Sequence, residues 1–206
     1  MTKLKFAIIS GSTRKKDPQS SKVAKYIKTH IENELQQNTY LLDLSEVALK
    51  YWDETFWTDY ANFDANWTAA SSEIRSSDGI VVVAPEWNGT TPPALKNVFH
   101  LATKGEMANK PGLIVSVSSG INGAYPIVEL RSSCYKNNFI NYIPQHVIVR
   151  NVNNVLNSSE ANSTEDDKLT HERLDYSLKI LHAYAEGFVH IRNSEIIKNT
   201  PFPYGM

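Results

Sequence analysis

The stretch that decides the fold is Gly79-Ile80-Val81-Val82-Val83-Ala84, an unbroken apolar run near the middle of the chain. It shows no alternation of apolar and polar residues, and this is typical of a strand buried on both faces, as in a parallel sheet. β-Branched residues also favour the pleated backbone. We therefore expect a central parallel strand here.

On either side of this run, shorter apolar stretches alternate with amphipathic ones. The pattern predicts strands over 4–9, 40–44, 79–84, 112–117 and 146–149, and helices over 20–37, 65–77, 92–103, 124–137 and 166–192. Five strand–helix units in succession predict an α/β fold with a doubly wound parallel sheet. Right-handed crossovers would then place helices on both faces of the sheet.

Three other stretches carry weaker signals. The aromatic-rich residues 51–67 have poor helical periodicity and receive no element; they could belong to the core, to a subunit interface or to the substrate side of a site. The polar stretch 151–167 is expected to be an exposed connection, and 199–206 a surface tail. We expect one domain over 1–206, with its core over about 3–192.

Composition narrows the class of protein. The 206 residues carry a formal net charge of −1, which gives no support for binding to nucleic acid or to an anionic membrane. A single cysteine excludes an internal disulfide and fits a reducing compartment. No apolar run approaches the roughly 20 residues needed to cross a bilayer, and no signal-peptide core opens the chain. We expect a soluble, cytoplasmic protein without membrane or nucleic-acid partners.

In doubly wound sheets, ligands bind beyond the carboxyl ends of the strands. This rule selects three loops, over 10–21, 85–91 and 116–124, and all three hold the unusual residues of the chain. Their agreement points to one shared ligand site.

The first loop reads Ser10-Gly11-Ser12-Thr13-Arg14, with Gln19-Ser20 following at the start of a helix. Hydroxyls, an arginine and the N–H groups of a helix N-terminus are together suited to a phosphate. The loop is neither a Walker A sequence nor a G-x-G-x-x-G fingerprint. A phosphate monoester is the ligand that we expect; an ordinary solvated turn with a helix cap is the alternative.

The other two loops suit a flat ring. The second is Pro85-Glu86-Trp87-Asn88-Gly89, in which Asn-Gly can take left-handed backbone and present N–H groups to a heteroaromatic edge. The third, around Ser118-Ser119-Gly120, is small and polar, so its backbone can approach a ring closely. Each alone could equally be a common strand–helix turn.

Taken together, these motifs resemble the NADPH-dependent FMN reductase family of flavodoxin-like quinone, azo-compound and chromate reductases. The matching blocks are Gly11-Ser12-Thr13-Arg14 with Gln19-Ser20, Pro85 to Gly89 with Leu95-Lys96-Asn97, the loop 118–123, and Leu130-Arg131. They cover about residues 4–150 in the family's order and spacing. The resemblance implies a flavodoxin-like three-layer fold with a sheet of order 2-1-3-4-5.

The resemblance also implies roles for these residues toward a bound FMN. The phosphate would lie against Ser12, Arg14, Gln19 and Ser20; the ribityl chain and ring against Pro85, Glu86, Trp87, Asn88 and Gly89; and the pyrimidine side against Ser118, Ser119 and Gly120. Three positions depart from the family pattern: Trp87 stands for the usual tyrosine, Gly123-Ala124 for paired glycines, and Pro18 for a frequent serine.

For activity, the resemblance implies hydride transfer from NADPH or NADH through flavin N5 to a flat acceptor, such as a quinone, azo compound, free flavin or metal oxyanion, in a ping-pong cycle. The flavin carries the chemistry, so no side chain is named as catalytic. A dimer or tetramer is also implied. An FMN-binding electron carrier is the main alternative, although the phosphate loop typical of flavodoxins is absent; a flavin-free member of the fold is a third.

A metal site is not expected. His171, His182 and His190 are 11 and 8 residues apart on one predicted helix and form no chelating pair, and the other three histidines are scattered. Cys134, placed on the fourth predicted helix, has no partner cysteine and is expected to be a small buried residue.

Overall fold

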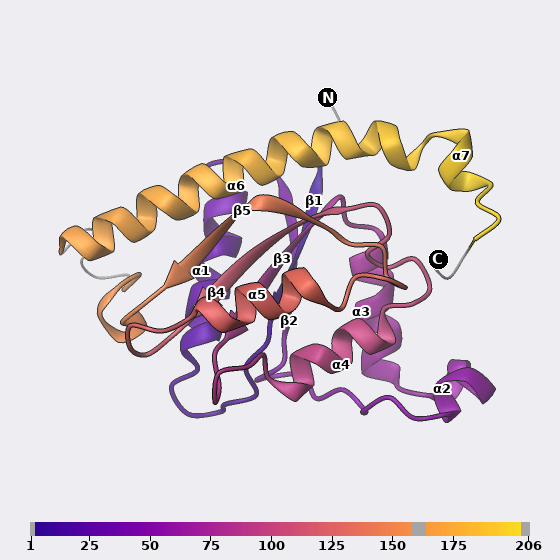
Figure 1. Ribbon diagram of the computed structural model, residues 1–206, viewed down its shortest axis with the longest axis horizontal. Coiled ribbons are helices and arrows are strands. Elements are labelled where there is room, and N and C mark those ends of the chain that lie inside the picture. Colours follow the sequence, from indigo (N-terminus) through magenta and orange to yellow (C-terminus); the bar gives the residue numbers. More distant parts are fainter. Residues whose placement is uncertain (1–2, 158–163, 203–206) are drawn as a thin grey trace.

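The computed structural model describes residues 3–157 and 164–202 (Figure 1). Its centre is a parallel sheet of five strands: β1 (Lys5–Ser10), β2 (Asn38–Asp43), β3 (Gly79–Pro85), β4 (Pro111–Val117) and β5 (Asn141–Val149). The strand order is β2-β1-β3-β4-β5. The predicted doubly wound α/β fold of order 2-1-3-4-5 is confirmed.

Helices cover both faces of the sheet (Figure 1). One face packs against α1 (Gln19–Asn33) and the long α6 (Glu165–Arg192); the other packs against α3 (Ala65–Arg75), α4 (Pro93–Leu101) and α5 (Ala124–Ser132). Four short helices complete the order: α2 (Thr55–Thr58), η1 (Tyr60–Asn62), η2 (Val152–Asn154) and α7 (Glu195–Lys198).

Alternate strand residues feed two separate cores. In β1, Phe6 and Ile8 point to the layer of α1 and α6, whereas Ala7 and Ile9 point to that of α3, α4 and α5. All seven residues of β3 are buried. This two-sided burial is why the central run carries no polar residue.

Helix α1 ends at Asn33, four residues before the predicted end, and two further element boundaries differ by about five residues from the expectation. Helix α5 ends at Ser132 rather than near 137, because Ser133 is extended and Cys134 has a φ of 60°. Cys134 therefore lies beyond the helix and is half-buried. Strand β5 begins at Asn141, five residues before the predicted start. It passes through Pro144 because it is an edge strand, whose ladder to β4 shifts register between Gly112 and Ile114.

The aromatic segment divides between core and surface. Phe56, Phe63 and Trp67 are buried in the core on the side of α3, α4 and α5, whereas Trp57 is 72% exposed. The stretch after β5 was predicted to be an exposed connection, and this is wrong for Val152, Val155 and Leu156, which are buried in the α1–α6 core. The predicted tail is exposed over 199–202; its remaining residues lie outside the described part of the chain.

Helix α6 has 28 residues, which correspond to about 42 Å of α-helix. Charged and polar residues recur along it, so it covers the sheet with one face only. Within residues 3–157 and 164–202, no helix combines the length and apolarity that a bilayer crossing requires.

Candidate functional site

The three predicted loops leave neighbouring strands at the same edge of the sheet. Each begins with a backbone hydrogen bond to the next strand: Gly11 N–H to Val83 O (2.9 Å), Glu86 N–H to Val117 O (3.0 Å) and Ser118 N–H to Val149 O (2.9 Å). The carboxyl ends of β1, β3, β4 and β5 are therefore aligned. This is the edge at which doubly wound sheets bind ligands.

The first loop passes close to α4 before it turns into α1. A Cβ on Gly11 would lie 2.5 Å from Leu95 Cδ2, so only glycine allows this approach. The Ser12 side chain is buried, and its Oγ accepts a hydrogen bond from Arg14 N–H at 3.3 Å. Residues 13–17 are exposed, with Arg14 among them.

Helix α1 begins with Pro18 at the N-cap, a residue without a side-chain oxygen for the first helical N–H groups. Ser20 lies in this first turn and is buried. The neighbouring Ser21 is engaged elsewhere, since its hydroxyl donates to Asp43. Gln19 Oε1 is buried and, within the described residues, meets no hydrogen-bond donor. This end of the helix presents the donors and dipole that an anion requires.

The second loop is a two-residue hairpin. Trp87 and Thr90 exchange backbone hydrogen bonds of 3.0 and 3.1 Å, and Asn88 and Gly89 between them have φ values of 51° and 71°. Positive φ at both central positions is the mark of a type I′ turn, for which Asn-Gly is the preferred sequence. The left-handed backbone predicted from Asn-Gly is confirmed.

Glu129, on α5, fixes the far side of this hairpin. Its carboxylate accepts from Thr90 Oγ1 at 2.9 Å and from Thr91 N–H at 2.7 Å, and it forms an ion pair with Lys96 of α4. Burial acts to raise the pKa of Glu129, but the bonds from Lys96, Thr91 and Thr90 outweigh it and lower the pKa to about 2. Glu129 is thus ionised throughout the neutral range and binds the second loop to α5.

The second and third loops are joined by Glu86. Its Oε2 accepts from Gly123 N–H at 2.8 Å and from Tyr125 N–H at 3.3 Å, at the start of α5. A carboxylate in this position satisfies N–H groups that the helix leaves open and complements its dipole. The resemblance implies that Glu86 lines the flavin. In the structure its Oε2 binds the start of α5 and so positions the third loop.

The third loop is tied to the chain beyond β5. Ser118 O accepts from Val152 N–H at 3.1 Å, and Gly120 O from Asn151 N–H at 3.0 Å. Arg150 Nε donates to the carbonyls of Ile121 and Asn122 at 2.6 and 3.1 Å. Gly123 has a φ of 109°, and a Cβ there would lie 2.4 Å from Ile148 Cγ2.

Beside the first loop lies a mostly apolar hollow of about 190 Å³. Its lining includes Leu44, Val47, Leu49 and Tyr51, together with Thr13 of the first loop. Asn97 of α4 fixes the end of this lining segment around Tyr51. Its Nδ2 donates to Lys50 O at 3.0 Å, and its Oδ1 accepts from Trp52 N–H at 2.8 Å. The hollow has the character that a flat apolar group needs.

The geometry at this edge agrees with a sequence comparison. Residues 4–154 match the family model described as NADPH-dependent FMN reductase. The chain belongs to this family. It is an FMN-dependent oxidoreductase that takes its reducing equivalents from NAD(P)H.

Two curated relatives illustrate the match. An NADPH azoreductase of Bacillus sp. (strain OY1-2) is 26% identical over 146 residues, which are 71% of this chain and 76% of that protein. A quinone reductase of Pseudomonas putida (strain KT2440) is 31% identical over 126 residues. That match spans 58% of this chain and 62% of the quinone reductase's own length.

Solved structures agree on the fold. The flavoenzyme NAD(P)H:(acceptor) oxidoreductase FerB from Paracoccus denitrificans superposes with a TM-score of 0.63 at 18% identity, over 91% of this chain and 98% of that one. A flavodoxin from the domain Archaea superposes with a TM-score of 0.51 at 11% identity, over 91% of this chain and all of that one. The fold of this FMN reductase is therefore flavodoxin-like.

The residues at the edge fit an FMN. The start of α1 offers N–H groups that Pro18 cannot cap, with Ser12 and Ser20 beside them, and this suits the terminal phosphate. Gln19 lies in the same turn, and its buried Oε1 has no hydrogen-bond donor in the described part of the chain. The hairpin at Asn88-Gly89 and the fixed third loop leave a lined edge for the ring.

The structure brings all twelve predicted site residues to this edge, since each lies in one of the three loops or at the end of its strand. Sequence reasoning missed Glu129 and Arg150 as residues that hold the loops. Glu129 directly precedes the motif Leu130-Arg131, but its partner in the second loop is 39 residues away and no local pattern signals the contact. In the described part of the chain, no cluster of three metal-ligating side chains occurs.

Proposed function

We propose that this FMN reductase passes hydride from NAD(P)H to a flat acceptor of the quinone or azo class in a ping-pong cycle. When bound, FMN would supply the hydride-transfer chemistry at its N5. Two relatives are named for such acceptors, an NADPH azoreductase and a quinone reductase. The protein's own task is to bind, orient and shield.

In this proposal, Ser12, Arg14, Gln19 and Ser20 hold the phosphate. Ser12 and Ser20 are buried at the start of α1, where the helix dipole favours a dianion. Arg14 is exposed in the same loop, and its guanidinium would donate to the phosphate.

The ring would be held by residues of the second and third loops. One side of it would be lined by Pro85, Glu86, Trp87, Asn88 and Gly89, and the pyrimidine side by Ser118, Ser119 and Gly120. Backbone N–H groups of these loops would stabilise negative charge on the ring, in the manner of an oxyanion hole. The observation that carries the proposal is that Glu86 and Glu129 lock both loops to α5, so the ring site is preorganised.

One shared position for donor and acceptor accounts for the ping-pong cycle. A flat acceptor is recognised by stacking and by apolar contact rather than by hydrogen bonds. The hollow bounded by Leu44, Val47 and Tyr51 lies next to the first loop and offers such contact. Loss of the donor product must precede entry of the acceptor.

The test is anaerobic titration of the purified protein with NADPH and NADH. Bound FMN should bleach near its absorption bands, and addition of a quinone or azo dye should restore the colour. Initial rates at several concentrations of both substrates should give parallel double-reciprocal lines. A protein that binds FMN but is not bleached would match an electron carrier instead, and one that cannot be reconstituted with FMN would overturn the proposal.

The substitution Arg14→Ala tests the role proposed for Arg14 in FMN binding. Loss of a charge-assisted bond to phosphate should weaken FMN binding by the apoprotein by roughly tenfold or more. Lys16→Ala removes a positive charge two residues away, from the exposed tip of the same loop, and should leave FMN affinity within about twofold. Equal losses in both variants would show a general charge effect and count against the assigned role of Arg14.

We also propose that the protein works in the cytoplasm as a dimer or tetramer, organised as one domain. Exposed apolar side chains on and before α5 support self-association: Ile121 is 78%, Tyr125 65% and Val128 65% exposed. Light scattering coupled to gel filtration should give a mass of two or four chains, and a monomer at micromolar concentration would overturn this part.

A further inference from the structure

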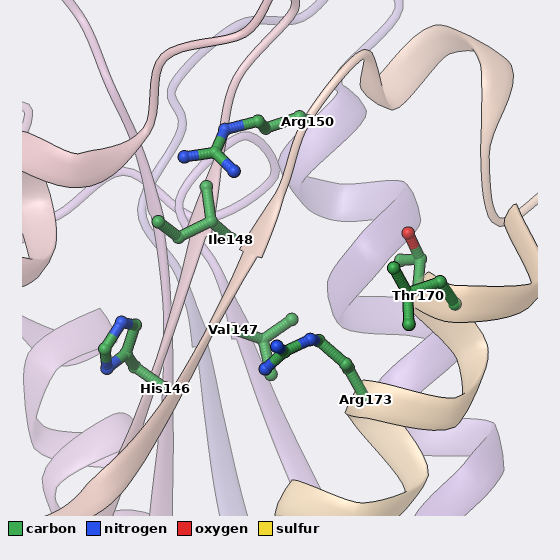
Figure 2. A pocket seen from close by; sticks show the side chains of 7 residues that line it. His146, Val147, Ile148, Arg150, Thr170 and Arg173 are labelled. Atoms are coloured by element: carbon green, nitrogen blue, oxygen red, sulfur yellow. The ribbon is translucent and has the colours of Figure 1, made fainter. Parts of the chain in front are cut away.

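A cationic cavity lies on the outer side of β5, against the N-terminal half of α6. Its volume is about 340 Å³, and its lining includes His146, Arg150, Thr170 and Arg173. Figure 2 shows Arg150 just beyond the end of β5 and Arg173 reaching from α6 toward Val147. Among the residues that the structure describes, the lining has two guanidinium groups, one imidazole and no carboxylate.

The donors of these arginines are not consumed by acidic side chains. Within residues 3–157 and 164–202, neither guanidinium lies within 4.0 Å of a carboxylate. Arg150 Nε donates to the carbonyls of Ile121 and Asn122, and within the described part of the chain its two terminal NH₂ groups make no hydrogen bond. A guanidinium held in this way is a pre-oriented fork for phosphate.

His146 contributes an imidazole to the lining of the cavity. Burial and the positive charges of Arg131 and Arg173 lower the pKa of His146, against the raising effect of a hydrogen bond to the Pro144 backbone. Arg131 itself is committed to the carbonyls of Ile143, Pro144 and Gln145. The imidazole thus sits among cations without adding a charge of its own at neutral pH.

A second hollow of about 490 Å³ continues the cavity along α6. The two share His146, Leu169 and Arg173, and the second adds Tyr176 and one acidic residue, Glu172. Leu169 is 50% and Tyr176 58% exposed. An exposed aromatic ring and an apolar side chain are suited to contact the face of a nucleobase.

We propose that this β5–α6 groove binds the adenosine 2′-phosphate end of NADPH, an inference that rests on the function proposed above. Arg150 and Arg173 would hold the dianionic phosphate, and the adenine would lie along Leu169 and Tyr176. The groove lies beside the third loop, since Arg150 of its lining donates to the carbonyls of Ile121 and Asn122. NADH lacks the 2′-phosphate, so the groove selects NADPH as the donor.

The test measures binding to the holoprotein by calorimetry, with 2′,5′-ADP and 5′-AMP as probes and inorganic phosphate as a third ligand. We expect 2′,5′-ADP to bind at least about tenfold more tightly than 5′-AMP or phosphate. Arg173→Ala should remove this preference, and Arg173→Lys should restore part of it. Lys179→Ala, which removes a charge from the same helix outside the groove, should leave it unchanged.

Equal affinity of the wild type for 2′,5′-ADP and 5′-AMP would overturn the inference, as would a preference that persists in Arg173→Ala. Binding of inorganic phosphate as tight as that of 2′,5′-ADP would also overturn it, because the groove would then recognise no nucleoside. Binding of the probes does not require hydride transfer, so these outcomes are separate from a failure of NADPH to bleach the flavin.

Discussion

At the scale of single residues, the lowered pKa of Glu129 makes the stability of the protein depend on pH. The pKa of this carboxyl group is about 2 in the folded chain, below the ordinary value of 4.5. Between these values the unfolded chain binds a proton that the folded chain does not. The stability that the carboxylate contributes is therefore fully present above pH 4.5 and is lost as the pH falls toward 2.

We expect Glu129→Gln to lower the free energy of unfolding at pH 7, because the ion pair to Lys96 and the charge-assisted bonds to the second loop are lost. The difference in the free energy of unfolding between this variant and wild type should shrink steadily between pH 4.5 and 2. Thermal melts over this pH series measure it. Glu34→Gln, at an exposed carboxylate after α1, is the matched control; a gap that stays constant with pH would contradict the role given to Glu129.

At the scale of elements, the turns of the site depend on glycine for different reasons. Gly89 has a φ of 71° and open space around a Cβ, so Gly89→Ala meets only the backbone cost, about 1–2 kcal/mol. Gly123→Ala adds a collision with Ile148 Cγ2 at 2.4 Å and should cost about 2–4 kcal/mol.

Gly120, also in the third loop, is the control for Gly123→Ala. A Cβ at Gly120 meets no atom within 4 Å, and Gly120→Ala should change the free energy of unfolding by less than about 0.5 kcal/mol. Urea unfolding of the three variants gives the ranking. If Gly89→Ala were the costliest of the three, backbone strain and not packing would dominate at this edge.

At the scale of the whole molecule, the two edges of the sheet have different tasks. The carboxyl edge carries the site, and the amino edge is held by Lys110, which directly precedes β4. Its buried Nζ donates to Ile74 O and Arg75 O at 2.7 Å and to Glu106 O at 2.6 Å, and so caps the end of α3.

Lys110→Met should therefore cost about 2–4 kcal/mol of stability, because three buried carbonyls lose their donor. FMN affinity at a temperature well below the melt should stay within about twofold of wild type, since the site is at the opposite edge. Urea unfolding and FMN titration check the two parts. Lys136→Met, at an exposed lysine, should change neither; a large loss of FMN affinity in Lys110→Met would contradict the division between edges.

Much of the fold and the location of the site could be predicted from local patterns. The run at 79–84 indicated a strand buried on both faces, and Asn88-Gly89 indicated a left-handed turn; the structure has both. The end of α5 and the start of β5 were placed wrongly. Cys134 and Pro144 interrupt the local pattern there, and packing on β4 decides where each element stops.

The sequence by itself determined the order of strands and helices and the three loops that form the candidate site. Hydrophobic periodicity and turn chemistry act over a few residues, so they can be read along the chain. Only the tertiary structure decided that Glu86 caps α5, that Glu129 supports the second loop and that Arg150 joins the third loop to the β5–α6 groove. These contacts link residues 28 to 39 positions apart, and they exist because parallel crossovers align distant strand ends at one edge.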